Sequence, residues 1–431
     1  MKKVLIVSPH FPPVNAADIH RVRQSLPYFK QFGWEPTVLC VAPEYVEMAM
    51  DDNLEKSIPK DIEIQKVMAY STKYTRKFGL GNLGIRAFWQ LYKEGHRLLK
   101  AEQFDLVYFS TTVFASMPLG RLWKRKFKIP FIIDMQDPWR NDYYLTLSKA
   151  ERPPKFWFAH RLNCFLEKKT IPWVDGIISV STSYINILKK RYPLIKNVPV
   201  KVITFGTHSP DLIISKNLKK NELKYNLDNT EINIVYAGVV PPNMLFVIEA
   251  ILTALKKGHE TNPDFKIVKL HFIGTNYAIG NKRKSLLKGL IDKFGLNNNV
   301  FEKQDRVSYF EVLKLIQESD LAIIPGTTDK DYTASKIYPY ISAKVPLLSV
   351  FHEESSVNVI LKEIEYGRRI SFNNQTNPEV LSDKIYEEIC RFLQLGQPNS
   401  NFKEKKFSEY ESESKTAQQT SFFEETLLSK K

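Results

Sequence analysis

Short apolar runs recur along this chain, separated by segments of helical periodicity. In the first half they are VLIVS (4–8), TVLCV (37–41), DLVYFS (105–110), PFIID (130–134), GIISVS (176–181) and KVITF (201–205). In the second half they are INIVYAG (232–238), KLHFIG (269–274), NVFE (299–302), DLAIIPG (320–326) and VPLLSVF (345–351). Runs of this length alternating with helical segments indicate βα units and a parallel sheet. We therefore predict an α/β fold.

The chain of 431 residues is too long for one ordinary core, so two domains are expected. A polar stretch rich in Lys and Asn, 206–231, separates the two sets of runs. We predict two Rossmann-like, doubly wound domains, residues 1–205 and 206–395. A polar tail, 396–431, follows them. Within it Phe422, Phe423 and Leu427 recur at near-helical spacing, which predicts a final helix that docks on the protein.

The composition excludes several classes of protein. A hydrophobic content of 43% and an aromatic content of 12% exclude a disordered chain. The cysteines, Cys40, Cys164 and Cys390, are far apart, match no metal-binding spacing and cannot form a closed set of disulfides, which indicates a reducing, cytoplasmic interior. No apolar run approaches the roughly 18 to 20 residues of a membrane-spanning helix. We expect a soluble or peripheral protein.

The net charge of +15 is concentrated in one segment. Residues 76–128 contain eleven Lys or Arg against three Asp or Glu. Within this segment, residues 81–100 combine Phe88, Trp89 and several leucines with basic residues. That pattern fits an amphipathic helix on an anionic membrane face, or an ordinary surface helix whose apolar stripe faces the core. We find no nucleic-acid-binding module, so nucleic acid is not an expected partner.

The ends of the predicted strands carry the candidate site residues, because ligands of open α/β sheets bind at the carboxyl ends of the strands. The run 130–134 ends in Asp134, followed by Asp137, Pro138 and Trp139. Either aspartate taken alone could be a helix cap or a turn residue. Other strand ends provide Ser8 to Pro13, Gly238 with Val239, Gly274, and the segment 325–336.

Several segments carry a resemblance to a known family. SPHFPPVNAADIHRVRQSLPYFKQFGWEPTVL, IIDMQDPWRNDYY and SKIYPYISAKVPLL resemble, in this order, segments of the GT-B glycosyltransferases of family 4. The resemblance extends from about residue 1 to about 395. It implies two Rossmann-like domains facing each other across a cleft, with the nucleotide-sugar on the second and the acceptor on the first.

The resemblance also implies roles for individual residues. Asp137 would be the catalytic or orienting carboxylate, and Asp134 more a buried hydrogen-bond partner that fixes the loop. The acceptor-binding candidates are His10, Arg21, Asp134 and Trp139. For Arg21 a solvated helix face, and for Trp139 packing in the core or the loop, are the alternatives. The nucleotide-sugar-binding candidates are Gly238, Val239, Gly274, Asp331, Ser335 and Lys336.

The chain departs from the family pattern at the expected diphosphate and ribose sites. The loop after 232–238 reads VVPPNM and lacks the usual cation, and Pro339 stands where the family has Glu. We predict that Pro339 lies in the first turn of a helix that starts near Ile337. Asp329 and Asp331 fit the paired carboxylates of metal-using transferases, but a chance pair is the better interpretation, so we expect neither a metal nor another cofactor.

The sequence thus predicts a metal-independent glycosyltransferase, retaining by resemblance, that uses a nucleotide-sugar donor and a surface polysaccharide, glycolipid or related acceptor. It would act in the cytoplasm, with a peripheral position on the inner face of the cell membrane as a further expectation. The alternative is a degenerate GT-B protein that serves as a sugar-binding or scaffold partner of an active transferase. Glu167, which precedes Lys168 and Lys169, is expected in a surface or interdomain salt bridge.

Overall fold

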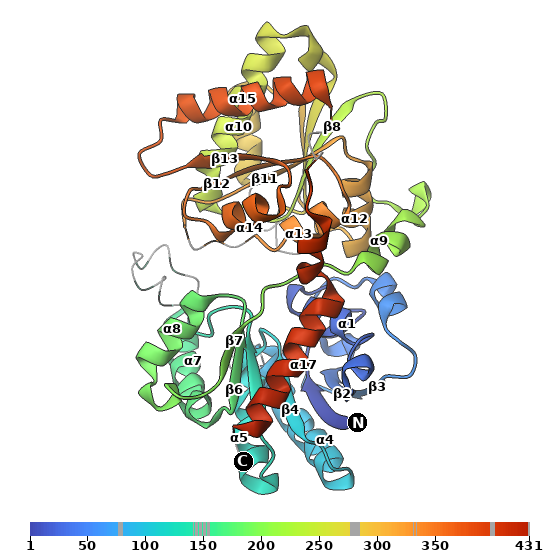
Figure 1. The fold of residues 1–431 in the computed structure, drawn as a ribbon, viewed down its shortest axis with the longest axis vertical. Helices are drawn as coiled ribbons and strands as arrows, with labels where there is room; N and C mark the ends of the chain where they lie inside the picture. Colours follow the sequence, from blue (N-terminus) through green and yellow to red (C-terminus); the bar gives the residue numbers. More distant parts are fainter. Residues whose placement is uncertain are drawn as a thin grey trace. The chain divides into compact units, whose positions relative to one another are not determined.

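The structure is a computed structural model that describes residues 1–75, 81–140, 142, 145, 149, 152, 156–275, 285–330, 332, 334–396 and 401–429. The chain forms two compact units (Figure 1). Unit 1 comprises Met1–Phe205 together with Ser412–Lys431, and unit 2 comprises Gly206–Glu411.

Unit 1 is built on a seven-stranded sheet in the order β3-β2-β1-β4-β5-β6-β7, in which every pair of neighbours is parallel. The strands are β1 (Lys2–Val7), β2 (Trp34–Val41), β3 (Glu63–Val67), β4 (Leu106–Ser110), β5 (Phe131–Met135), β6 (Gly176–Ser179) and β7 (Val200–Val202). The helices are α1 (His20–Ser25), α2 (Thr72–Thr75), α3 (Leu83–Arg86), α4 (Phe88–Ala101), α5 (Pro118–Phe127), α7 (Phe156–Thr170), α8 (Thr182–Arg191) and α17 (Ser412–Leu428).

Unit 2 is built on a six-stranded parallel sheet in the order β10-β9-β8-β11-β12-β13. The strands are β8 (Ile232–Ala237), β9 (Val268–Ile273), β10 (Val300–Lys303), β11 (Leu321–Pro325), β12 (Leu347–His352) and β13 (Arg368–Phe372). The helices are α9 (Ser209–Lys216), α10 (Leu245–Thr261), α11 (Leu286–Phe294), α12 (Tyr309–Glu318), α13 (Ile337–Ser342), α14 (Ser356–Ile364), α15 (Pro378–Leu395) and α16 (Glu404–Phe407).

All eleven predicted strands are present, and the α/β fold with two doubly wound sheets is confirmed. Two further strands, β3 and β13, have no counterpart among the predicted runs. Both lie at an edge of their sheet and leave part of their side chains exposed, as in EIQKV (63–67) and RRISF (368–372). An edge strand needs no continuous apolar run, so this signal is missing from its sequence.

The predicted final helix exists as α17, and it packs within unit 1, far in sequence from the rest of that unit (Figure 1). Phe422 and Phe423 are buried among the residues of the unit 1 core. The ring of Phe423 lies 5.3 Å from that of Trp34 and 5.0 Å from that of Tyr108, measured between ring centroids. The C-terminal segment therefore completes the hydrophobic core of unit 1.

The segment 81–100 forms α3 and α4, whereas residues 76–80 of the basic region lie outside the described part of the chain. Leu91, Leu98 and Leu99 of α4 are buried. This burial favours the interpretation as an ordinary surface helix with its apolar stripe on the core. Membrane contact by this segment stays a prediction.

Replacing Phe423 by Ala should destabilise unit 1 strongly. The ring is fully buried and touches three other aromatic rings, so its removal leaves a cavity. We expect a loss of about 3–5 kcal/mol in the free energy of unfolding, measured by urea denaturation followed by tryptophan fluorescence. Leu428→Ala on the same helix is the matched control, because that side chain is 64% exposed. Equal unfolding midpoints for the two variants would contradict this account of the core.

Candidate functional site

The strand order reverses between β1 and β4 in unit 1, since β1 pairs with β2 on one side and with β4 on the other. The loops that follow β1 and β4 diverge at such a point and leave room for a ligand at the carboxyl edge. His10 follows β1, Thr111 follows β4, and Asp137 follows β5. The candidates predicted for this domain are thus brought to one edge of one sheet.

A buried ion pair supports this edge. The guanidinium Nε of Arg21, on α1, lies 2.6 Å from Oδ2 of Asp134, on β5, and both side chains are buried. Arg21 also donates a hydrogen bond of 2.7 Å to the carbonyl of Ile203, and its guanidinium lies over the ring of Phe205. The solvated-helix alternative for Arg21 is therefore wrong. Because both charges are buried and paired, they fix the strand ends. Direct contact of Arg21 or Asp134 with an acceptor stays a prediction.

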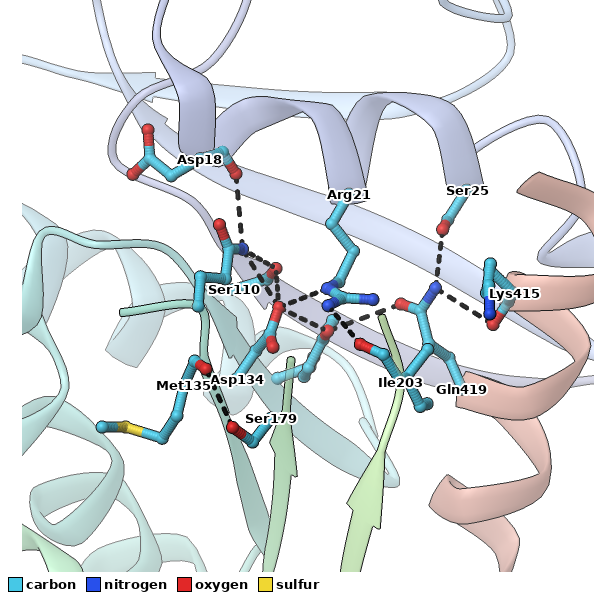
Figure 2. Close-up of polar contacts among 12 residues, drawn as sticks. Asp18, Arg21, Ser25, Ser110, Asp134, Met135, Ser179, Ile203, Lys415 and Gln419 are labelled. Atoms are coloured by element: carbon cyan, nitrogen blue, oxygen red, sulfur yellow. Dashed lines mark hydrogen bonds and ion pairs between the residues drawn. The ribbon is translucent and has the colours of Figure 1, made fainter. Parts of the chain in front are cut away.

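The carboxylate of Asp134 gathers further donors, as Figure 2 shows. Ser110 donates its hydroxyl at 2.9 Å and Gln136 its amide at 3.0 Å. Tyr108 contacts both Asp134 and Gln419 of α17 at 3.4 Å, and Gln419 donates to Ser25 on α1 at 2.8 Å. A single polar network therefore connects α17, α1 and the ends of β4 and β5.

Asp18 is a site residue that the sequence reasoning missed. Its carboxylate contacts Nδ1 of His10 at 3.0 Å and accepts hydrogen bonds from the hydroxyl of Thr111 at 2.8 Å and the N–H of Thr112 at 2.9 Å. Burial alone would raise the pKa of Asp18. The hydrogen bond to His10, the charge of His10, and the hydrogen bonds from Thr112 and Thr111 outweigh this effect and lower the pKa to about 2. An ionised Asp18 orients the ring of His10 and leaves Nε2 for another partner. No sequence pattern indicates this contact, because His10 and Asp18 are eight residues apart along the chain.

Asp137 lies beside this pair, and its side chain is exposed to solvent. Partial desolvation of the carboxylate by the surrounding protein raises the pKa of Asp137, and the negative charge of Asp18 adds to this effect, so that the pKa reaches about 6. Asp134 and Asp137 therefore differ sharply, although they are three residues apart. Asp134 is a buried structural charge, and Asp137 is an accessible carboxylate that titrates near neutral pH.

Trp139 does not present its ring to a ligand. The side chain is buried and stacks on Phe114, with 5.6 Å between the ring centroids. The prediction that Trp139 stacks on an acceptor is corrected accordingly, and the packing alternative holds. The ring fixes the loop that carries Asp137.

In unit 2 the carboxyl edge collects glycine and cationic side chains. The strand order reverses between β8 and β11. Gly238 follows β8, Gly274 follows β9, and Lys336 immediately precedes α13, which comes after β11. Nζ of Lys336 donates to the hydroxyl of Tyr236 at 3.0 Å and lies 4.7 Å from the centroid of its ring. The lysine ammonium thus rests at the end of β8.

Gly238 is required at this position for two reasons. Its φ of 152° is one that L side chains rarely adopt, and a Cβ placed on it would lie 1.6 Å from Nζ of Lys336. Gly274, at φ 68°, adopts the left-handed conformation at the end of the neighbouring strand. The missing side chain at Gly238 is therefore what admits the ammonium group.

Arg306, in the loop after β10, is a second cation that the sequence reasoning missed. Burial and then the positive charge of Arg306 lower the pKa of Lys336 to about 7. The 239–244 loop contributes no cation, and the carbonyl of Val239 accepts a hydrogen bond from Tyr236. The positive charge that acts on Lys336 therefore comes from Arg306 in the loop after β10. No sequence pattern marks Arg306, because its place depends on the position of β10 in the sheet.

The remaining predicted nucleotide-binding residues have different outcomes. Ser335 is exposed beside Lys336. Asp331 lies outside the described residues. Pro339 occupies the first turn of α13, which begins at Ile337, as predicted. Among the described residues no group of three or more His, Cys, Asp or Glu side chains could hold a metal ion, and no helix is both long and apolar enough to cross a membrane.

The prediction for Glu167 is wrong. Its side chain is fully buried in unit 1, where Oε1 lies 2.6 Å from the guanidinium of Arg191 and accepts a hydrogen bond from Tyr192. The same arginine reaches Asp142, which also contacts His160. The surface pattern of Glu167-Lys168-Lys169 misled because only the two lysines face solvent. This cluster attaches the segment after β5 to α7 and α8.

Residues 20–208 match the model of Glycosyltransferase Family 4, and none of the curated proteins matches the chain. Solved structures are similar over the full length. HepE of Anabaena in complex with UDP is 14% identical, with a TM-score of 0.61, over 99% of this chain and 100% of its own. Sucrose-phosphate synthase from Thermosynechococcus elongatus is 12% identical, with a TM-score of 0.60 and 100% of both chains covered.

A UDP-forming trehalose-phosphate synthase from Burkholderia vietnamiensis is 11% identical, with a TM-score of 0.63 and 100% of both chains covered. Similarity at these identities shows the fold, and it is that of the GT-B glycosyltransferases. The family match over residues 20–208 supports a glycosyltransferase type of function. The chain therefore has the GT-B fold, and its residues 20–208 match family 4 of the glycosyltransferases.

Proposed function

We propose that this protein transfers a sugar from a nucleoside-diphosphate sugar to a saccharide acceptor, with the diphosphate held on unit 2 by Lys336, Arg306 and the backbone around Gly238. The observation that carries the proposal is the Lys336 ammonium, which is buried at the end of β8 and has its pKa lowered by burial and by a second cation. The positive charge of Arg306 repels the Lys336 ammonium. A bound anion would relieve that repulsion.

The diphosphate leaving group gains negative charge as the bond to the sugar breaks, so it needs stabilisation in the transition state. Lys336 and Arg306 would supply it as cations, and the loop amides beside Gly238 as hydrogen-bond donors. In keeping with the sequence prediction, we propose that transfer is metal-independent and retains the anomeric configuration. The complexes of HepE with UDP and with UDP-glucose support a uridine nucleotide as the first donor to test.

On unit 1 we propose Asp137 as the carboxylate that orients the acceptor hydroxyl, with His10 as a neighbouring ligand held by Asp18. Asp137 is accessible and lies at the carboxyl edge, which supports this role. We further propose a surface polysaccharide, glycolipid or related acceptor, and a cytoplasmic protein that is peripheral to the inner face of the membrane. The three cysteines are free thiols, which agrees with a reducing compartment.

A second candidate function is a sugar-binding or scaffold protein without catalysis. Pro339, in place of the expected Glu, favours it, because proline offers neither a carboxylate for the ribose nor a backbone donor. Arg306 in the loop after β10 weighs against this alternative, because it supplies a positive charge that the 239–244 loop lacks.

Gly238→Ala should abolish nucleotide binding without unfolding the protein. The new methyl group would displace the Lys336 ammonium, which is the flexible end of a side chain, and the backbone strain at φ 152° should lower the melting temperature of the free protein. The measurement is a thermal-shift assay with UDP, GDP, ADP, CMP and their sugars. We expect at least one of these ligands to raise the melting temperature of the wild type. The shift should be lost in Gly238→Ala and in Lys336→Ala.

Gly289→Ala on α11 is the matched control, because no atom lies within 4 Å of its added Cβ. Its nucleotide-induced shift should equal that of the wild type. No shift with any nucleotide in the wild-type protein would favour the scaffold function. A full shift in Gly238→Ala would place the diphosphate elsewhere.

Asp137→Asn should lose sugar transfer while the protein remains folded. In the wild type, the carboxylate form of Asp137 predominates only above a pH of about 6, so turnover should fall as pH is lowered through that value. Asp18→Asn removes the neighbouring negative charge and should move this acidic limb to lower pH. The measurement is release of nucleotide from the donor identified by thermal shift, followed across pH.

Asp134→Asn provides the contrast, because it breaks a buried ion pair. We expect it to lower the free energy of unfolding by about 3–5 kcal/mol, whereas Asp137→Asn, at an exposed position, should change it by less than about 0.5 kcal/mol. Urea denaturation of both variants distinguishes the two roles. Wild-type turnover in Asp137→Asn would refute the proposed role of this carboxylate.

A further inference from the structure

Helix α7 has an unusual distribution of side chains for a helix on the surface of a domain. Its solvent side exposes Trp157 by 65% and Phe165 by 56%, and Phe158 is exposed as well. Its protein side buries Glu167, which is paired with Arg191. Large aromatic side chains gathered on one exposed face indicate a surface that meets a partner.

The exposed face of α7 alternates aromatic and cationic side chains. Trp157, Arg161, Phe165 and Lys169 follow one another at intervals of four residues, so they lie along one side of the helix. The guanidinium of Arg161 lies 5.8 Å from the ring of Trp157, and the ammonium of Lys169 lies 5.6 Å from the ring of Phe165. We refer to these four residues as the α7 stripe.

The basic and aromatic character continues from the α7 stripe onto α5. Arg121 of α5 donates to the carbonyl of Lys169, and its guanidinium lies 4.8 Å from the ring of Trp173, just beyond α7. Arg125 and Lys126 of α5 are exposed. Neither α5 nor α7 contains an acidic residue other than the buried Glu167. The exposed charged side chains of α5 and α7 themselves are therefore all cationic.

We propose that the α7 stripe is a docking surface for a membrane that contains anionic phospholipids. Cations attract the headgroups, while Trp and Phe rings enter the boundary between headgroups and acyl chains, so this combination of side chains fits a lipid surface. A convex helix ridge suits a flat membrane better than a nucleic-acid strand, which is usually bound in a groove. A second copy of this chain is disfavoured by its net charge of +15.

The position of α7 connects this surface with the candidate acceptor edge. The helix joins the parallel strands β5 and β6, so it starts at the carboxyl edge of the sheet, where the loop with Asp137 lies. A membrane bound to the α7 stripe would bring a lipid-borne acceptor to that edge. This connection rests on the proposed transfer reaction, whereas the docking surface itself does not.

The test is co-sedimentation of the full chain with vesicles of phosphatidylcholine alone and with vesicles that also contain phosphatidylglycerol. The wild type should bind only the vesicles with phosphatidylglycerol, and less at higher salt. The charge variant Arg161→Gln/Lys168→Gln/Lys169→Gln, which includes the exposed neighbour Lys168 of the stripe, should reduce the partition coefficient by about 100-fold. The aromatic variant Trp157→Ala/Phe165→Ala, with all charges kept, should reduce it by about tenfold or more.

Two matched controls keep the proposal falsifiable. Lys288→Gln/Lys362→Gln/Lys384→Gln removes the same charge from exposed positions of unit 2. Ile213→Ala removes a large apolar side chain that is 66% exposed on α9 of unit 2. Both should bind like the wild type. All variants change exposed residues, and their thermal unfolding should match that of the wild type.

Four results would overturn the proposal. One is the absence of binding to phosphatidylglycerol vesicles, and another is equal loss of binding in the stripe variants and their controls. A third is binding of a single-stranded RNA probe, in place of vesicles, that the stripe variants abolish. The fourth is a dimer in light scattering that Trp157→Ala/Phe165→Ala dissociates. None of these measurements requires transferase activity, so failure of the docking surface and failure of the proposed function are distinguishable.

Discussion

A parallel sheet directs the carboxyl ends of all its strands to one edge, and this constraint determines where chemistry can occur in both units. The sheet of each unit reverses its strand order once, between β1 and β4 in unit 1 and between β8 and β11 in unit 2. Loops diverge at these points, and polar or cationic side chains from several loops gather there. His10, Asp18 and Asp137 meet in unit 1, and Gly238, Arg306 and Lys336 meet in unit 2.

The two edges differ in how their charges are balanced. In unit 1 the buried charges are paired within the protein: Arg21 with Asp134, and Asp18 with His10 and two threonines. Such pairs stabilise the loop geometry and leave Asp137 as the accessible group. In unit 2 the pKa of Lys336 is lowered because the ammonium is buried and Arg306 lies near it. The first edge is thus internally neutralised, and at the second we propose that an anion binds.

The sequence predicts features that depend on local pattern and misses those that depend on assembly. Central strands are continuous apolar runs and were predicted, whereas the edge strands β3 and β13 lack that signal. Gly238 was identified by its position after a strand, and Lys336 by such a position together with the resemblance to family 4. Asp18 and Arg306 act only through neighbours brought in by other loops, so nothing local marks them. Glu167 was misjudged, and for Trp139 both packing and acceptor stacking stayed open, because sequence does not show which face of a helix or loop is buried.

The most direct test of the account is the number of protons taken up when UDP binds. At pH 8, Lys336 with its pKa of about 7 should be mainly neutral in the free protein and charged beside the diphosphate. Calorimetry in two buffers of different ionisation enthalpy should therefore show uptake of close to one proton by the wild type, and none by any UDP binding that remains in Lys336→Met. Binding of UDP without proton uptake, or with equal uptake in Lys336→Met, would contradict the anion site proposed at the end of β8.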